Sequence, residues 1–288
     1  MKRILMITVR ADHGGGPKHL LDLVRCIKSQ HPEDQILISS PLEEPYGPLF
    51  QKLASNFLPI PHRKFSVRAW LQMIRLIHSG HIDVIHSHGR GAGLYSRLLK
   101  VVCPRVQVVH TFHGFHRSPG LLGALKVAVD QWLAPFADQY IAVAEDEKDL
   151  LQKNGCLSSR PCLVILNGVE VPDKTPARTN SFRGFFGTLA RFDHQKGLDI
   201  LLARLTELAQ NSKGAPNWKF QLAGFPTSQL HVPQVLKDRV SLLGPVSNPQ
   251  GFLQSLDCYV STSRWEGLPL AVLEAMAQGK PVLLSDVP

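Results

Sequence analysis

Hydrophobic and polar positions along the chain form short apolar runs that alternate with longer amphipathic segments. Short apolar runs are typical of buried strands, and longer runs with a period of 3.6 residues are typical of helices. Their regular alternation predicts repeated βα units and a parallel sheet. In the first part of the chain, the predicted strands are 4–9, 35–39, 84–87, 106–111, 139–143 and 163–166, and the helices are 17–30, 67–78, 91–102, 121–136 and 146–154. We expect one doubly wound domain of six strands here.

A polar segment at 171–182 interrupts this rhythm. It has two prolines and no hydrophobic periodicity, as is typical of a linker. The alternation then resumes, with predicted strands at 185–189, 220–223, 240–243, 259–262 and 282–285 and helices at 197–211, 249–256 and 269–278. We therefore predict an N-terminal domain over 1–170 and a C-terminal domain over 183–288. The second domain is expected to be incomplete, because no helix follows its last strand to cover the sheet.

Composition narrows the class of protein. With 44% hydrophobic and 19% charged residues, the chain is typical of a soluble enzyme and not of a disordered or fibrous protein. The first apolar run meets Arg10 and Asp12 too early for a signal peptide, and no run is long enough to span a membrane. Five cysteines without a C-x-x-C pair fit buried thiols in a reducing compartment. We expect a cytoplasmic protein.

The chain is strongly basic, with a net charge of +9. This charge favours polyanions, but it does not choose between nucleic acid, anionic lipid and phosphorylated substrates. The basic amphipathic stretch 61–77 could lie on an anionic membrane as a helix. The βαβ rhythm requires a crossover helix at this place, and therefore favours a helix packed on the sheet.

The segment 261–282 carries the most informative chemistry. A strand is followed by Glu266 and Gly267, and a helix then begins near Pro269. The N-terminus of a helix at the carboxyl end of a parallel sheet offers backbone N–H groups to a diphosphate. Glu266 and Glu274 add two carboxylates that can accept hydrogen bonds from sugar hydroxyls. The alternative for Glu274 is a solvent-facing side chain.

Arg191 and Lys196 occupy a second loop between a predicted strand and a helix. Two cations at such a place can neutralise a leaving diphosphate, Arg through its planar fork and Lys as a point charge. The alternative is an ordinary pair of surface charges.

A glycine loop, with Gly15 and Gly16 at its end, lies between the first strand and the first helix. Glycines allow a phosphate or a sugar to approach the backbone closely. The loop is not a dinucleotide fingerprint, because His19 stands where the last glycine of G-x-G-x-x-G would be.

His110, His113 and His116 are spaced by three at the end of another strand, which suggests a zinc site. Alternate side chains diverge at a strand end, however, and no acidic residue or cysteine joins the three. We therefore expect no metal. His113 then either contacts a ligand or simply ends the strand.

Together these motifs resemble those of a known family. W-E-G-L-P-L-x-x-L-E-A-M-A-x-G-x-P-V, from Trp265 to Val282, resembles the E-x7-E signature of retaining GT-B glycosyltransferases, in particular glycosyltransferase family 4. The patches around Arg191 and Lys196, around Gly15 and Gly16, and the T-x-H-G motif with His113 are similar to that family's motifs. The resemblance implies donor-sugar contacts for Glu266 and His113, phosphate contacts for Gly267, Leu268, Arg191 and Lys196, ribose contacts for Glu274, and donor and acceptor contacts for Gly15 and Gly16.

The same resemblance implies a fold and a function. We expect two Rossmann-like domains facing a cleft, with the acceptor on the N-terminal side and a nucleoside diphosphate sugar on the C-terminal side. The implied reaction is transfer of a hexose to a hydroxyl acceptor with retention and without a metal or cofactor. The implied setting is envelope polysaccharide or lipid-linked saccharide synthesis, with a saccharide or lipid-linked acceptor, peripheral contact with the inner membrane and no nucleic acid partner. Two alternatives stay open: a nucleotide-sugar epimerase, and a non-catalytic nucleotide-sugar-binding remnant of a C-terminally truncated chain.

Overall fold

The computed structural model describes residues 1–115, 120–172, 182–211, 217–226 and 230–287. The chain splits into two compact units, Met1–Asn167 and Gly168–Pro288. Most of the predicted linker, residues 173–181, lies outside the described residues, as does His116. None of the described helices has both the length and the hydropathy needed to cross a bilayer.

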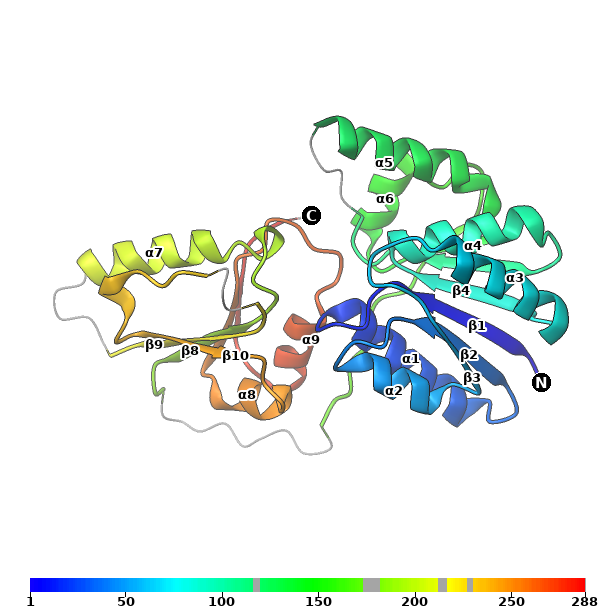
Figure 1. Cartoon of the computed structure of the whole chain (residues 1–288). Coiled ribbons are helices and arrows are strands. Elements are labelled where there is room, and N and C mark those ends of the chain that lie inside the picture. The colour runs from blue at the N-terminus through cyan, green and yellow to red at the C-terminus, as the bar shows by residue number, and fades with distance from the viewer. Residues whose placement is uncertain (116–119, 173–181, 212–216, 227–229, 288) are drawn as a thin grey trace. The chain divides into compact units, whose positions relative to one another are not determined.

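A parallel sheet forms the centre of the first unit (Figure 1). Its strand order is β3-β2-β1-β4-β5-β6-β7, so the winding direction reverses between β1 and β4. Ligand sites of open α/β sheets lie at the carboxyl ends of the strands beside such a switch point. The strands are β1 (Arg3–Thr8), β2 (Gln35–Ser40), β3 (Asn56–Pro59), β4 (Val84–His88), β5 (Gln107–Thr111), β6 (Gln139–Ala142) and β7 (Cys162–Val164).

The prediction of six strands in this unit is wrong by one. The extra strand, β3, is a short edge strand with two exposed residues and a terminal proline, so it lacks the apolar run of a buried strand. The preceding helix α2 (Tyr46–Leu53) was also not predicted. Its first turn holds Gly47 and Pro48, which sequence patterns assign to turns.

Helices pack on both faces of this sheet, because alternate strand residues point to opposite sides. In β1, Leu5 and Ile7 join one buried cluster and Met6 joins another. The helices besides α2 are α1 (Gly15–Gln30), α3 (Val67–Gly80), α4 (Arg90–Val102), α5 (Gly120–Leu133) and α6 (Glu145–Lys153), with a 3-10 turn η1 at Ala134–Phe136. α3 buries Ala69, Met73 and Ile77, and is therefore the crossover helix that the βαβ rhythm required.

The second unit holds a parallel sheet with the order β10-β9-β8-β11-β12. The strands are β8 (Phe185–Leu189), β9 (Lys219–Ala223), β10 (Val240–Gly244), β11 (Cys258–Ser261) and β12 (Val282–Leu284). The helices are α7 (Leu198–Asn211), α8 (Pro249–Ser255) and α9 (Leu270–Ala277), with 3-10 turns η2 at His194–Lys196 and η4 at Gln234–Leu236. On the edge strand β12, Leu283 and Leu284 are 62% and 44% exposed.

Candidate functional site

In the second unit, the loops that follow β8 and β11 are fastened to each other. Thr262 Oγ1 donates to the carbonyl oxygens of Lys196 and Gly197, at 3.3 and 3.0 Å. Gly197 has a φ of 61°, and a Cβ added there would lie 2.0 Å from the Thr262 carbonyl oxygen. This position therefore requires glycine, both for its left-handed backbone and for the close approach of the two loops.

Lys196 and Glu266 form the central contact of this site. The Lys196 ammonium lies 2.5 Å from Glu266 Oε1, and the two side chains are only 19% and 15% exposed. Ser263 Oγ donates to the same carboxylate oxygen at 2.6 Å, and the Gln195 amide lies 3.4 Å from the other one. Partial burial strengthens such an ion pair compared with a pair in open solvent. An anionic ligand that binds Lys196 must compete with Glu266.

Arg191 belongs to the same loop but has a different main partner. Its guanidinium lies 2.6 Å from Asp193 Oδ2 and donates to Gln195 Oε1 at 3.1 Å. Asp193 also caps the following turn by accepting from the Lys196 backbone N–H at 3.3 Å. Sequence analysis missed Asp193, Gln195 and Ser263, of which Asp193 could have been found from the cap signal of an Asp before a helical turn.

Gly267, Leu268 and Glu274 lie around the start of α9, whose N-cap residue is Pro269. Glu274 is on the helix, close enough to influence the buried Tyr259 below it. Burial first of all, and the charges of Glu266 and Glu274 in addition, raise the pKa of Tyr259 to about 12. Both glutamates of the E-x7-E motif thus act electrostatically on one buried phenol.

In the first unit, Gly15 and Gly16 open α1, directly after the loop that follows β1. A Cβ added to Gly16 would meet no atom within 4 Å outside its own helix. Nearby, Arg10 folds back onto Asp12 with two hydrogen bonds of 2.7 and 2.9 Å. The Gly16 backbone is therefore open to a ligand on this side.

Histidines gather at the carboxyl end of the first sheet. His88 ends β4 and His113 follows β5, and their rings meet with 3.0 Å between His88 Nδ1 and His113 Nε2. His19, one turn into α1, places its ring centroid 4.6 Å from that of His113. The His86 ring is tilted against the His88 ring, with 4.1 Å between the two centroids. The histidines that meet His113 come from neighbouring elements, and not from the H-x-x-H spacing within its own segment, since His110 Nδ1 contacts Ser87 instead.

Burial lowers the pKa of every one of these imidazoles below its usual value, to about 3 for His86. Burial in a medium of low polarity disfavours the imidazolium ion, and neighbouring rings add to the effect. The first unit thus presents neutral imidazoles, which can both donate and accept hydrogen bonds.

Glu147, which sequence analysis missed, holds the loop that carries His113. Its carboxylate accepts hydrogen bonds from the backbone N–H groups of Gly114, Phe115 and Val143, at 2.5, 2.8 and 2.8 Å. Burial raises the pKa of Glu147, and these three donors oppose that shift. His113 itself has a φ of 60°, a conformation that needs such support. No pattern in the sequence links Glu147 to this loop, because the contact spans more than thirty residues.

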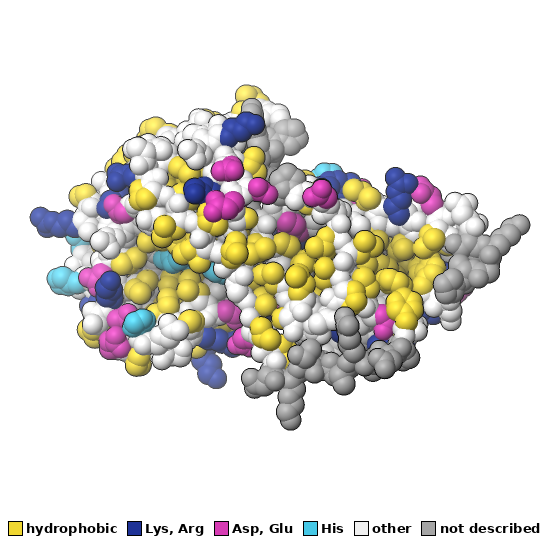
Figure 2. Space-filling view, turned by 180° about the vertical axis from the view of Figure 1, so that it is seen from behind, with side chains coloured by type: hydrophobic (Ala, Val, Ile, Leu, Met, Phe, Trp, Pro, Cys, Tyr) yellow, Lys and Arg dark blue, Asp and Glu magenta, His cyan; other side chains and the backbone are white. Residues whose placement is uncertain are grey.

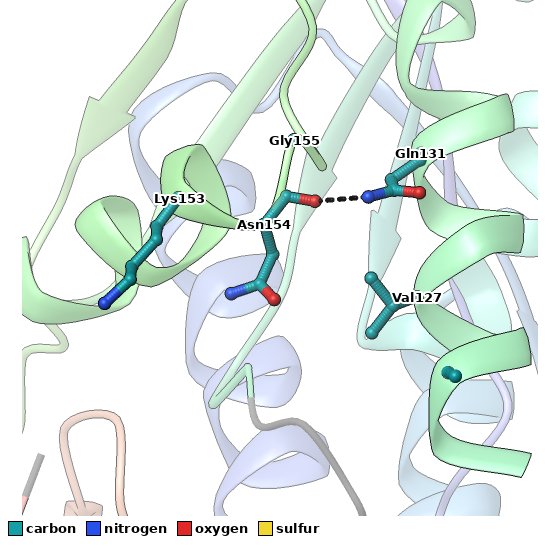
Figure 3. Close-up of a pocket in the computed structure, with 6 residues that line it drawn as sticks. Val127, Gln131, Lys153, Asn154 and Gly155 are labelled. Carbon is teal, nitrogen blue, oxygen red and sulfur yellow. Dashed lines mark hydrogen bonds between the residues drawn. The ribbon is translucent and has the colours of Figure 1, made fainter. Parts of the chain in front are cut away.

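A pocket of about 520 Å³ lies elsewhere in the first unit, between α5 and the end of α6. Figure 3 shows Gln131 reaching toward the main chain of Asn154, whose carbonyl oxygen it contacts at 2.8 Å. Val127 and Lys153 also line it. None of the residues predicted for the site lines this pocket.

Acidic and basic side chains are interspersed on the face that Figure 2 shows, rather than gathered into one basic surface. On this face, such a distribution differs from the concentrated basic stripe that marks nucleic-acid-binding proteins.

Two parallel-sheet units with polar loops at the carboxyl ends of their strands are the architecture of GT-B glycosyltransferases. The chain belongs to glycosyltransferase family 4: the model of that family matches residues 13–172, and the model of glycosyl transferases group 1 matches residues 183–288. The solved structure of Anabaena Alr3699/HepE in complex with UDP and glucose has the same fold, with a TM-score of 0.80. The two sequences are 18% identical, and the match covers 100% of this chain and 81% of the HepE chain.

Curated relatives agree with this assignment. UDP-Gal:alpha-D-GlcNAc-diphosphoundecaprenol alpha-1,3-galactosyltransferase from Escherichia coli is 26% identical over 84% of this chain and 69% of its own length. Lipopolysaccharide core biosynthesis mannosyltransferase LpsB from Rhizobium meliloti is 33% identical over 44% of this chain and 41% of its own. The match thus spans 69% of the first relative and less than half of the second. Both relatives are transferases, which does not favour the epimerase alternative.

Proposed function

We propose that this chain transfers a hexose from a nucleoside diphosphate sugar to a hydroxyl acceptor, with retention of the anomeric configuration. The observation that carries the proposal is the Lys196–Glu266 pair, 2.5 Å apart and largely buried beside the start of α9. A cation, a carboxylate and a helix N-terminus in one place match the three parts of such a donor: diphosphate, sugar hydroxyls and leaving-group charge.

The roles proposed in the second unit follow from this arrangement. Lys196 and Arg191 bind the diphosphate, and the backbone N–H groups of Gly267 and Leu268 add to its binding. Glu266, released from Lys196 by the incoming phosphate, accepts hydrogen bonds from the sugar hydroxyls. Glu274 accepts hydrogen bonds from the ribose.

The roles proposed in the first unit rest on neutral groups. His113 contacts the donor sugar, and a neutral imidazole can pair with a hydroxyl as donor or acceptor. Gly15 and Gly16 let donor and acceptor approach the backbone, consistent with the open space beside Gly16. Glu147 acts through His113 by holding its loop.

The proposed reaction breaks the bond between the sugar's anomeric carbon and the diphosphate oxygen, whose electron pair leaves with the diphosphate. The acceptor oxygen bonds to the same face of that carbon, and the proton of the acceptor hydroxyl passes to the departing diphosphate oxygen. Negative charge grows on the diphosphate as the bond breaks, so fixed cations that meet it there lower the barrier most. The scheme uses no metal and no cofactor.

The proposed setting is cell-envelope polysaccharide or lipid-linked saccharide synthesis at the inner face of the membrane. The name of the first relative gives GlcNAc-diphosphoundecaprenol as its acceptor, and the names of two others give cellobiosyl-diphosphopolyprenol and lipopolysaccharide core biosynthesis. On α5, Leu121, Leu122 and Trp132 are 86%, 73% and 65% exposed. An exposed apolar helix face supports peripheral contact with lipid. Co-sedimentation with anionic vesicles, which should fall in a Leu121→Ser/Leu122→Ser variant, tests this part.

Thermal unfolding of the chain with UDP, GDP, ADP, CMP and their common sugar conjugates tests donor binding. A ligand at 100 times its Kd should stabilise the folded chain by about 2.7 kcal/mol and raise the midpoint. Lys196→Met should abolish that shift, whereas substitution of the exposed Lys237 by Met should preserve it. An unchanged midpoint with every nucleotide would reject the proposal. It would favour the alternative that the chain is a non-catalytic remnant that has lost its donor site.

Retention is tested on the product. With an α-linked donor identified by the unfolding screen, the anomeric proton coupling of the isolated product should show an α linkage. A β linkage would reject the same-face reaction while leaving the donor assignment intact.

A further inference from the structure

Three imidazoles at the first sheet are arranged like the ligands of a metal ion. His19, His88 and His113 each offer a ring nitrogen, and these nitrogens lie within 4.8 Å of one another. They come from α1 after β1, from the end of β4 and from the loop after β5, and β1, β4 and β5 are neighbours in the sheet. The set is therefore assembled by the topology, not by sequence spacing.

The frame that carries these imidazoles is rigid. β4 is paired in register with β1 on one side and β5 on the other, so His88 is fixed from both sides. Glu147 holds the backbone next to His113 with hydrogen bonds to Gly114 and Phe115. A site preorganised in this way needs only small ring movements to bind an ion, because two nitrogens on one tetrahedral Zn²⁺ lie about 3.3 Å apart.

His88 supplies an independent indication of a ligand. Its side chain is buried, with 4% exposed, and its Nε2 atom has no hydrogen-bond partner among the described residues. Its Nδ1 atom contacts another imidazole, that of His113, at 3.0 Å. A buried ring nitrogen without a partner is unfavourable, and it leaves the His88 ring free to use either nitrogen as a ligand.

We propose that His19, His88 and His113 form a binding site for one Zn²⁺ ion. Three imidazoles with a fourth position left for water or a ligand are a known zinc-binding set. Among the described residues the group contains no carboxylate and no thiolate, so hard ions such as Mg²⁺ have little reason to bind. Burial lowers the pKa of each of the three rings, so they are in the neutral form that a metal requires.

The site has a consequence that rests on the proposed function. If His113 contacts the donor sugar, an ion bound to His113 takes it away from that role. Zn²⁺ then inhibits transfer, and donor and ion compete for the same imidazole.

Binding is tested on the whole chain by titration against a chromogenic zinc chelator, with Zn²⁺ alone as the ligand. We expect one tight site per chain. His19→Gln and His88→Gln should each weaken it by more than about 100-fold, beyond the 10- to 100-fold loss seen when only a group that orients a ligand is removed. His31→Gln is the matched control, because His31, Glu33 and Asp34 form an exposed second group that could hold an ion. Zn²⁺ binding that is lost in His31→Gln but kept in His19→Gln overturns the proposal.

Spectroscopy distinguishes a specific loss of Zn²⁺ binding from misfolding of the variant. His19 is only partly buried on the surface of α1, so its variant should keep the circular dichroism spectrum of the parent chain. Co²⁺ bound in place of Zn²⁺ should show the intense visible bands of a tetrahedral site in the parent and in His31→Gln, and none in His19→Gln. Octahedral, weak bands in the parent chain would contradict a three-histidine site.

The proposed inhibition of sugar transfer by Zn²⁺ is measured separately. Transfer should decrease as free Zn²⁺ rises and recover on chelation, and a saturating nucleotide sugar should weaken Zn²⁺ binding. Zn²⁺ binding without any effect on transfer would remove the inhibition but leave the metal site. A chain without transferase activity would contradict the proposed function and leave the zinc titration unaffected.

Discussion

The two units share one architecture but present opposite chemistry at the ends of their strands. At the first sheet, His88 is buried and His113 is partly buried, and both rings have lowered pKa values. At the second sheet, Lys196 and Glu266 are charged and paired, and Arg191 is paired with Asp193. The difference teaches that a common βα scaffold does not dictate what its loops bind, since the loop residues decide it.

The two glycine-bearing loops differ in the same way. Gly16 faces open space, whereas Gly197 is packed against the Thr262 carbonyl of its own unit. The first glycine leaves room for a ligand, and the second lets two loops lock together. Glycine thus makes room for a ligand in one unit and allows close loop packing in the other.

The largest expected effect is on the charged site of the second unit. Lys196→Ala should lower kcat by about 100- to 1,000-fold, as removal of a fixed group that stabilises transition-state charge does. Lys237→Ala, which removes an exposed lysine of the same unit, is the control and should leave kcat unchanged. Steady-state kinetics with the identified donor measure both. A decrease of less than tenfold for Lys196→Ala would mean that the charged site does not carry catalysis.

The second largest effect is expected from acid, which should destabilise the first unit more than the second. His86, His88, His110 and His113 have pKa values below the usual 6.5 in the folded chain, whereas the unfolded chain binds protons as pH falls below 6.5. Stability is therefore lost as pH decreases from 6.5 toward the folded pKa values, by up to about 1.4 kcal/mol per histidine and pH unit.

No such loss is expected from the acids of the second unit in that range. A hydrogen bond from Arg264 lowers the pKa of Asp199 to about 2. The stability that ionised Asp199 contributes is therefore lost only as the pH falls below the usual carboxyl pKa. Hydrogen exchange at about pH 7.5 and about pH 5.5, corrected for intrinsic rates, should show greater opening in peptides from β4 and β5 than in those from β11 and α9. Equal opening in both units would remove the electrostatic distinction between them.

The glycine comparison predicts a smaller effect on stability. Gly197→Ala places a Cβ 2.0 Å from a carbonyl oxygen at a φ of 61°, so it should destabilise the chain by at least about 1 to 3 kcal/mol. Urea unfolding followed by tryptophan fluorescence measures this change. A variant as stable as the parent would show that the two loops can separate without loss.

Gly16→Ala should have the smallest effect on stability and act on binding instead. Its Cβ meets no neighbouring atom, and alanine favours a helix over glycine by up to about 1 kcal/mol, so stability should stay equal or rise. The KM for the donor should increase, because the added methyl group occupies the space beside the backbone. Unchanged stability with unchanged KM would remove Gly16 from the binding surface.

Much of the fold could be predicted from the sequence, because buried parallel strands consist of continuous apolar runs. The strands of the second unit and most of the first were found in this way, including β1 and β11. The edge strand β3 was not, because half of its residues face solvent and leave no such run. The same limit applies to α2, whose stability comes from packing of Phe50 in the core despite an unfavourable first turn.

The sequence by itself determined the βα rhythm, the two units and the motifs around His113, Lys196 and Glu266, since each depends on residues close together in the chain. Only the tertiary structure decided which distant groups meet. The pairing of Lys196 with Glu266, the support of the His113 loop by Glu147 and the meeting of His19 with His88 all join residues far apart in the chain. Such contacts follow from strand order and loop closure, and these are properties of the sheet as a whole that no local pattern encodes.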